Sequence, residues 1–198
     1  MTLKMVYSFT EGNAKMKSLL GGKGANLAEM TRTGLPVPPG FTVTTEACHL
    51  FFRSGNRMPD ELLQQIRSAM HQLESEKGQR FGDPASPLLI SVRSGSVTSM
   101  PGMMDTILNL GLNDQTVEAL AAQTGNERFA YDCYRRLIQM FGNVVLGIES
   151  FQFDRLLHHL KKNLDLAQDQ EVTAEGWKQL IADYKKCVRA HAGIDFPQ

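Results

Sequence analysis

Hydrophobic residues in the second half of the chain recur every third or fourth position, as they do along one face of an α-helix. This spacing predicts helices from Asn113 to Gly125, from Asn126 through Phe141, from Phe151 to Leu164 and from Thr173 to Gly193. Asparagine and threonine are good N-caps, and glycine ends a helix readily because it accepts a left-handed backbone. Residues 113–198 are therefore predicted to form an all-helical subdomain.

Two of these helices have a clear apolar face. The last one carries Trp177, Leu180, Ile181, Tyr184 and Val188 in a single stripe, and the one after Asn126 carries Phe129, Cys133, Leu137, Met140 and Phe141. The adjacent basic residues Arg135 and Arg136 fall mostly off that apolar face, so both are predicted to point away from the core.

The first 112 residues instead mix short strands with helices. β-Branched and aromatic residues predict strands at Val6 to Phe9, at GFTVTT (residues 40–45) and at PLLISVR (residues 87–93). Helices are predicted from the GGKG turn through about Thr31, from Thr45 onward and from about Pro59 to Lys77. The fold class is thus α+β, with a small mixed sheet and its helices over residues 1–112 and the helical subdomain over residues 113–198.

Composition narrows the classes of partner. Of 198 residues, 42% are hydrophobic, which is enough for a packed core, and 21 basic residues balance 21 acidic ones. Because no global field favours polyanions, neither nucleic acid nor a membrane surface is an expected partner. No apolar run approaches the roughly 18 residues of a membrane span, and the N-terminus lacks a signal peptide's apolar core, so a cytoplasmic location is predicted.

Cysteine and histidine give no sign of a metal site. The three cysteines are far apart and form no CxxC pair, so small core positions are expected for Cys48, Cys133 and Cys187. The five histidines, His49, His71, His158, His159 and His191, are interpreted as surface or boundary residues. The chain ends in IDFPQ with no closing element, which predicts a truncated chain.

The stretch GGKGAN, residues 21–26, places Lys23 between glycines just before a helix. Glycines let a backbone approach a ligand, a helix N-terminus presents unpaired N–H groups, and lysine adds a mobile charge, all of which suit phosphate. The stretch is not a Walker A loop, because Gly24 follows the lysine where serine or threonine is needed. Taken alone, it is equally typical of a glycine turn with a solvated lysine.

A second candidate is SVRSGSVTSMPGMMDT, residues 91–106. Arg93 ends the predicted strand, on the face opposite Ile90 and Val92, with a planar fork suited to two phosphate oxygens. Hydroxyl donors follow at Ser94, Ser96, Thr98 and Ser99, and Gly95 and Gly102 let amides turn inward around an anion. Composition alone leaves the loop undecided between an anion site and a glycine-rich connection.

Other residues of this loop have plainer roles. The three methionines Met100, Met103 and Met104 are expected to pack beneath the loop, with a water-excluding cover as the alternative. Asp105 is interpreted first as a turn or cap residue and second as a residue that holds a magnesium-bound water.

The order of residues in these stretches carries a resemblance. LGGKGANLAEMTRTGLPVPPGFTVTTEAC (residues 20–48) and SVRSGSVTSMPGMMDTILNLGLND (residues 91–114) closely resemble the amino-terminal part of the pyruvate phosphate dikinases. The likeness continues through RFAYDCYRRLIQMFGNVV (residues 128–145) to the terminal FPQ, so it covers essentially the whole chain. Stretches of this length are far more specific than a bare glycine pattern.

The resemblance implies a partial ATP-grasp lobe followed by a helical subdomain. It assigns ATP phosphate contacts to Lys23 and Arg93, which are the implied catalytic residues, and it lays the loop from Gly95 to Asp105 over the phosphates. The implied ATP-binding set is Gly22, Lys23, Arg93, Ser94, Gly95, Ser96, Thr98, Ser99, Gly102 and Asp105. No metal ligand is assigned within the chain.

The resemblance also implies a larger enzyme. The family converts ATP, phosphate and pyruvate into AMP, pyrophosphate and phosphoenolpyruvate, with Mg²⁺ and a phosphohistidine carrier. The Mg²⁺ ligands, the phosphohistidine and the pyruvate site are expected beyond Gln198, so this fragment alone is expected to be inactive. The implied partners are ATP and the remaining domains of a homodimeric enzyme. The alternatives are a noncatalytic binding or interaction fragment and the corresponding domain of a related dikinase such as phosphoenolpyruvate synthase.

Overall fold

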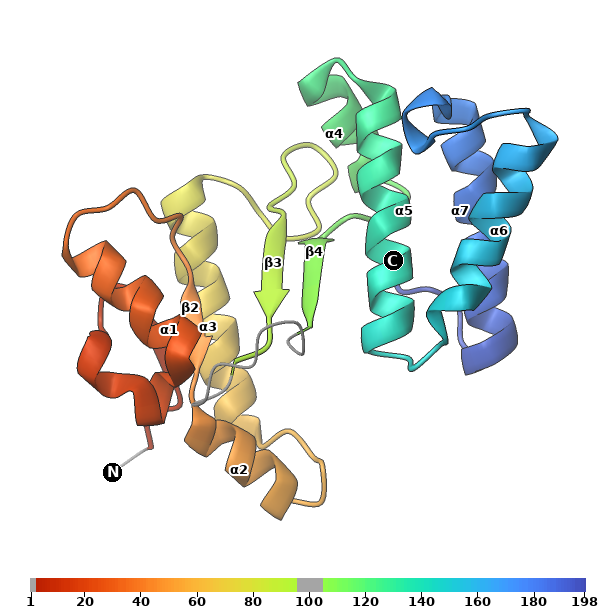
Figure 1. The fold of residues 1–198 in the computed structure, drawn as a ribbon. Coiled ribbons are helices and arrows are strands. Elements are labelled where there is room, and N and C mark those ends of the chain that lie inside the picture. The colour runs from red at the N-terminus through yellow and green to blue at the C-terminus, as the bar shows by residue number, and fades with distance from the viewer. Residues whose placement is uncertain (1–2, 96–104) are drawn as a thin grey trace. The chain divides into compact units, whose positions relative to one another are not determined.

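The computed structural model describes residues 3–95 and 105–198, and by contacts within the chain these residues form two units (Figure 1). The first unit runs up to Gly78 and includes Ser94 and Gly95, and the second comprises residues 79–93 and 105–198. Helices alternate with two small antiparallel sheets of two strands each, so the predicted α+β class is confirmed.

The first unit is a two-stranded sheet with helices around it. Its elements are β1 (Val6–Ser8), η1 (Ala14–Met16), α1 (Lys17–Arg32), β2 (Phe41–Val43), α2 (Thr45–Arg53) and α3 (Asp60–Lys77). Strands β1 and β2 pair antiparallel, with Val6 opposite Val43. Helix α3 is tied to the free edge of β1, because Gln65 accepts the backbone N–H groups of Met5 and Val6 and donates to the Leu3 carbonyl.

The hydrophobic cluster among the described residues of the first unit is small. Four buried residues form it, Met5, Val6, Ala47 and Leu62, with partly buried side chains from β2, α2 and α3 packed against them. Helix α2 begins at Thr44, whose hydroxyl accepts the N–H of Ala47, as expected of a threonine N-cap. Cys48 on this helix is exposed, so the predicted core position is wrong for this cysteine.

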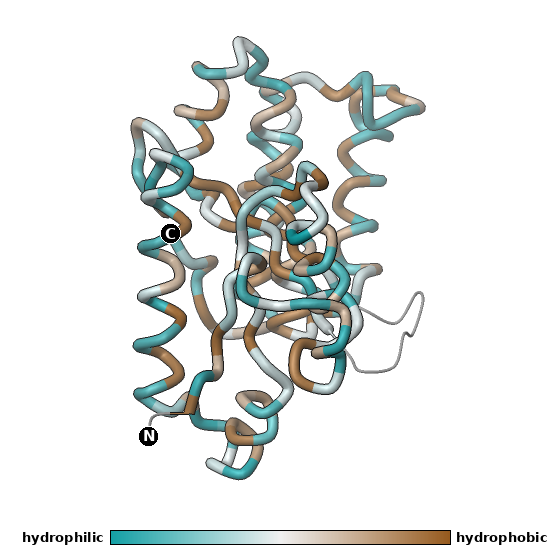
Figure 2. Tube along the Cα trace, turned by 90° about the vertical axis from the view of Figure 1, so that its left-hand side faces the viewer, coloured by the Kyte–Doolittle hydropathy of each residue, from teal (hydrophilic) through white to brown (hydrophobic). Residues whose placement is uncertain are grey.

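The second unit is a helical bundle with a hairpin beside it. Its elements are β3 (Ile90–Arg93), β4 (Thr106–Leu110), α4 (Thr116–Thr124), α5 (Glu127–Val144), α6 (Ser150–Asn163), η2 (Asp169–Glu171) and α7 (Ala174–Ala192). Helix α5 lies at the centre, in contact with β4, α4, α6 and α7. The hydropathy trace in Figure 2 shows hydrophobic and hydrophilic positions alternating along the helices, as amphipathic packing requires.

Four of the predicted helix ends in this unit are confirmed, whereas the predicted N-cap Asn113 lies before α4, whose N-cap is Gln115. Asn126 and Thr173 accept the N–H groups of Phe129 and Gly176, and Gly125 and Gly193 end their helices in the left-handed conformation. From the sequence we divided the chain at residue 112. In the structure β3 and β4 belong to the same unit as the helices, and the division at 112 stays a prediction about the family's domains.

The alternation predicted along β3 is interrupted. Ile90 lies opposite Leu110 but Val92 lies opposite Ile107, so the register shifts by one residue between them. Such a bulge rotates the strand and moves side chains off their expected face. Val92 is accordingly 46% exposed, whereas the regular pattern placed it on the Ile90 face.

Arg135 is buried, which corrects the prediction that it points away from the core. It is 5% exposed, and its Nε donates to Asp132 at 2.8 Å while Nη2 donates to Asp169 at 3.2 Å. Its guanidinium carbon lies 4.7 Å from the centroid of the Trp177 ring. Burial is tolerated because the charge is paired and the flat cation stacks on an aromatic face. Arg136 is exposed, as predicted.

Candidate functional site

Helix α1 is broken at the glycine turn that the sequence singles out. Gly21 has φ 68° and ψ 173°, outside the helical region, so a first turn at Lys17–Leu20 is followed by a second helical segment. Glycine adopts a positive φ without the steric penalty that a Cβ would impose. Lys23 therefore lies in the first turn of the restarted helix, where backbone N–H groups lack helical carbonyl partners.

The restarted helix is held closely against β2. Gly24 is buried, and a Cβ placed on it would lie 2.8 Å from both Cγ2 and Oγ1 of Thr42. The turn before the break is held separately, because the Thr45 hydroxyl donates to the Ser18 carbonyl at 2.7 Å. Two contacts on either side of Gly21 thus fix the backbone that carries Lys23.

The ammonium group of Lys23 contacts the backbone of the second candidate stretch. Its Nζ donates to the Ser94 carbonyl oxygen at 3.1 Å, across 71 residues of sequence. Ser94 and Gly95 are exposed, and a Cβ on Gly95 would meet nothing within 4 Å. The first unit therefore brings together Gly22, Lys23, Ser94 and Gly95, four of the predicted ATP-binding residues.

Arg93 and Asp105 lie at the end of the β3–β4 hairpin where the connecting stretch joins the two strands. Arg93 pairs with Thr106, and Asp105 precedes Thr106 directly, so strand pairing holds the two together at one end of the sheet. Both side chains belong to exposed residues. The remaining predicted residues of this stretch lie outside the described part of the chain: Ser96, Thr98, Ser99 and Gly102, together with Met100, Met103 and Met104. Their roles stay predictions.

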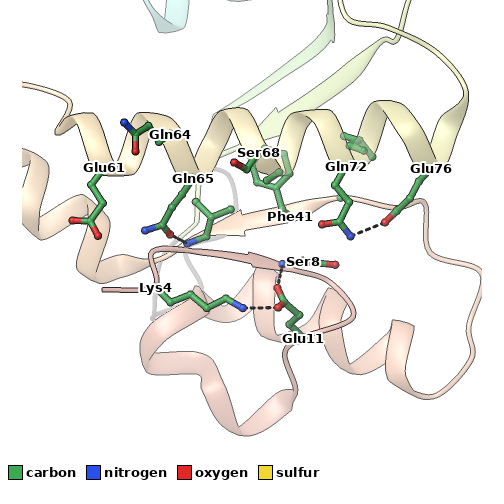
Figure 3. A pocket seen from close by; sticks show the side chains of 14 residues that line it. Lys4, Ser8, Glu11, Phe41, Glu61, Gln64, Gln65, Ser68, Gln72 and Glu76 are labelled. Atoms are coloured by element: carbon green, nitrogen blue, oxygen red, sulfur yellow. Dashed lines mark hydrogen bonds and ion pairs between the residues drawn. The ribbon is translucent and has the colours of Figure 1, made fainter. Parts of the chain in front are cut away.

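A separate cavity in the first unit was not foreseen from the sequence (Figure 3). It has a volume of about 430 Å³ and lies between α3 and the β1–β2 sheet, with Val6, Phe41 and Leu73 in its lining. Polar groups from α3, among them Glu61, Gln64, Gln65, Ser68, Gln72 and Glu76, line it together with Lys4, Ser8 and Glu11. None of the predicted site residues that the structure describes lines this cavity.

Two of the charged side chains in that cavity, Lys4 and Glu11, form an ion pair. Lys4 donates to Glu11, and this bond holds the pKa of the Glu11 carboxyl below its ordinary value, against partial burial, which raises it. The Ser8 N–H adds a further bond to the same carboxylate. Gln72 donates to Glu76 at 2.9 Å. The sequence does not reveal this cavity, because the polar residues of α3 that line it look like those of an ordinary solvent-exposed helix face.

Metal and membrane sites find no support in the described residues. Residues 3–95 and 105–198 contain no group of three or more His, Cys, Asp and Glu side chains that could hold a metal ion. Within the same residues, no helix is both long and apolar enough to cross a membrane.

Comparison with known proteins returns one consistent family. The model "Pyruvate phosphate dikinase, AMP/ATP-binding domain" matches residues 17–57 and 54–189. The pyruvate, phosphate dikinase of Clostridium symbiosum is 52% identical over 196 residues, which cover 98% of this chain and 22% of that protein. The one from Rhizobium meliloti is 49% identical over 199 residues, with the same coverage, 98% and 22%.

The likeness extends to plants. Pyruvate, phosphate dikinase 1, chloroplastic, from Zea mays is 50% identical over 200 residues, which cover 99% of this chain and 21% of that protein. The chain thus spans about a fifth of the length of the curated relatives it matches.

Proposed function

The chain belongs to the pyruvate phosphate dikinase family, and on that premise we propose that it is the ATP-binding part of such an enzyme, with Lys23 and Arg93 as its phosphate-binding cations. The contact between Lys23 Nζ and the Ser94 carbonyl carries this proposal. It joins the two stretches that the sequence marks as anion sites, and Ser94 is the residue that follows Arg93. The name of the matching family model, an AMP/ATP-binding domain, supports the same ligand.

The two cations suit the transfer of a phosphoryl group. Such a transfer depends on positioning and on neutralising charge, and it needs little covalent chemistry from the protein. Arg93 supplies a permanent charge and paired donors for two oxygens, while Lys23 supplies a point charge with three donors. Arg93 stabilises charge that develops on the transferred phosphates, and Lys23 orients the nucleotide. Amides and hydroxyls of the loop, with Ser94 and Gly95 at its start, complete the cradle.

The complete reaction extends beyond this chain. We propose that the enzyme converts ATP, phosphate and pyruvate into AMP, pyrophosphate and phosphoenolpyruvate through a phosphohistidine. None of the chain's five histidines lies in a threonine- and glycine-rich stretch of the kind expected for the carrier. We therefore assign the carrier histidine and the pyruvate site to the part of the relatives that this chain does not match. A homodimeric enzyme and a cytoplasmic location remain parts of the proposal, although the Zea mays relative is named as chloroplastic.

We assign no magnesium ligand to the described residues. They contain no group of three or more His, Cys, Asp and Glu side chains that could hold a metal ion, and Asp105, the nearest candidate in the sequence, is an exposed residue directly before β4. No step of the proposed chemistry is therefore assigned to a metal held by this chain. The protein ligands of the Mg²⁺ that accompanies ATP would lie outside this chain.

A chimaera tests the assignment. This chain replaces the matching stretch of the Clostridium symbiosum relative, and formation of AMP, pyrophosphate and phosphorylated enzyme from ATP and phosphate is measured. Lys23→Met and Arg93→Met are each expected to slow this half-reaction by about 10²- to 10³-fold, the usual cost of removing one group that stabilises transition-state charge. Lys17→Met, at an exposed lysine of the same helix, serves as the control. Near-normal rates in the first two variants would refute the assignment.

The competing function is a noncatalytic binding or interaction module. Calorimetry with ATP and Mg²⁺ on the 198-residue chain and on the chimaera separates the two. Binding by the chimaera, whether or not the chain alone binds, supports the enzymatic proposal. Binding by neither protein supports the interaction module. The corresponding domain of phosphoenolpyruvate synthase is disfavoured, because the relatives named above are dikinases of pyruvate and phosphate.

A further inference from the structure

Lys23 donates a hydrogen bond to the protein backbone, in addition to its proposed contact with phosphate. A lysine on a flexible four-carbon stem is normally a loosely placed charge. Here its Nζ lies 3.1 Å from a backbone carbonyl oxygen that is 71 residues away in sequence. The stem starts from a backbone fixed on both sides of the Gly21 break, by Thr42 against Gly24 and by Thr45 bonded to Ser18. The lysine therefore forms a link between an anchored helix and the exposed Ser94.

We propose that Lys23 is also a positioning residue, whose ammonium holds the Ser94 carbonyl and so fixes the backbone of Ser94 and Gly95 beside the phosphate site. This inference rests on the proposed function and adds a second role for the same side chain. The carbonyl in turn orients the ammonium. A backbone acceptor, unlike a carboxylate, does this without neutralising the positive charge that phosphate needs.

The donor count of lysine allows both roles at once. An ammonium group has three N–H donors and no acceptor. One donor serves the Ser94 carbonyl, which leaves two for phosphate oxygens. Gly95 contributes no side chain, and a Cβ placed on it would meet nothing within 4 Å. The bond from Lys23 restrains the backbone directly before it from an anchored helix.

The Arg93–Ser94 peptide bond provides a direct readout, because trypsin cleaves after arginine. Cleavage of a folded protein requires local opening, and its rate follows the population of the open form when opening is fast. In the 198-residue chain without nucleotide, Lys23→Met is expected to speed cleavage after Arg93 by about three- to tenfold, the effect of losing one such hydrogen bond. The fragment ending at Arg93 is quantified by mass spectrometry.

Three comparisons make the experiment decisive. Lys17→Met removes an exposed lysine from the same helix and is expected to leave the rate unchanged. Lys23→Arg keeps a donor and is expected to lie nearer the wild-type rate than Lys23→Met does. Cleavage after Arg67, in α3, is expected to be the same in all proteins. An unchanged rate after Arg93 in Lys23→Met overturns the proposal, as does a rate in Lys23→Arg equal to that of Lys23→Met. Equal acceleration at Arg67 also overturns it, since that would indicate general loosening.

The two proposals fail separately. The cleavage assay contains no nucleotide, so it reports the Lys23–Ser94 link alone. The AMP-forming half-reaction of the chimaera reports the phosphate role. A slow half-reaction in Lys23→Met with unchanged cleavage would leave the phosphate role standing without the positioning role, whereas the reverse result would leave Lys23 as a positioning residue only.

Discussion

The two units of this chain are held together in different ways. In the second unit, 18 buried residues form one hydrophobic cluster, including Trp177, Tyr134, Tyr184 and Phe153. Among the described residues of the first unit, the corresponding cluster has four buried residues. Close glycine contacts and single polar links, such as those of Gln65, Thr45 and Lys23, hold its elements as well. Lys23 itself is placed by the backbone geometry around the break at Gly21.

This difference predicts where a substitution acts. Removing a buried ring from the second unit should reduce the free energy of unfolding by several kcal/mol, because a cavity forms in a dense core. Changes near Lys23 should cost less stability and act chiefly on the geometry of the site.

The largest effect is expected at Phe153, which is fully buried in α6. Its ring lies 4.9 Å from that of Tyr184, centroid to centroid, and occupies the space beside Gly142. Phe153→Ala should lower the free energy of unfolding by about 3–5 kcal/mol. Urea denaturation followed by the fluorescence of the single tryptophan, Trp177, measures it. Phe151→Ala, a 56% exposed position of the same helix, should change stability by less than about 0.5 kcal/mol.

The next effect tests the buried charge of the second unit. Arg135→Met keeps the apolar stem but removes the guanidinium from Asp132, Asp169 and the Trp177 face. Both carboxylates keep a second cation, Arg136 and Lys161 respectively, so neither is left as an unpaired buried charge. We therefore expect a loss of about 1–3 kcal/mol, below the cost of a fully orphaned ion.

The matched control for that change is Arg136→Met. Arg136 shares Asp132 as a partner, but 54% of its side chain is exposed. An exposed ion pair contributes at most about 1 kcal/mol. Equal losses of unfolding free energy in the two variants would show that the burial of Arg135 has no energetic consequence.

The first unit is tested by the close approach of α1 to β2. Gly24→Ala gains helix propensity, but the new Cβ would lie 2.8 Å from Thr42, so strain should leave a net loss of about 1 kcal/mol. Thr42→Ala removes both clashing atoms. Gly24→Ala should therefore cost little unfolding free energy when it is made in the Thr42→Ala background. This corresponds to a coupling energy of about 1 kcal/mol between the two positions in a double-mutant cycle. Additive effects would mean that this contact does not set the position of the Lys23 turn.

The sequence predicts elements whose signals are local. Caps at Asn126 and Thr173, glycine stops and the apolar stripe of α7 each depend on a few neighbouring residues, and the structure confirms them. The stripe predicted for α5 is partly wrong, because Phe129 is 45% exposed whereas Tyr131, Tyr134 and Ile138 are buried. Strand β4 was not assigned, because its five residues acquire their role only by pairing with β3. The bulge in β3 escaped prediction for the same reason. A register shift depends on both strands at once.

Burial of charge is the second kind of information that the sequence lacks. Arg135 and Arg136 are adjacent and chemically identical, and only the placement of Trp177 and Asp169 on other elements decides which one enters the core. The candidate site shows the same limit. Lys23 and Arg93 were chosen from motifs, but the carbonyl that binds Lys23 carries no side-chain signature and appears only in three dimensions.

The smallest expected effect is a pH dependence of the second unit, at Asp169. Burial by itself raises the pKa of this carboxyl, but the bond from Lys161 and the charges of Lys161, Arg135 and Arg136 outweigh it, so the pKa lies below its ordinary value. A carboxyl with a lowered folded-state pKa stabilises the protein above its unfolded-state pKa, about 3.9, and loses that contribution as the pH falls through the folded-state value. Stability contributed by Asp169 should thus be complete at pH 6 and decline below about pH 4.

Asp169→Asn should shrink the difference in unfolding free energy between pH 6 and pH 3, measured by urea titration at each pH. Asp165→Asn, in the same connection between α6 and α7, gives the reference, and an equal pH dependence in both variants would remove Asp169 as a contributor.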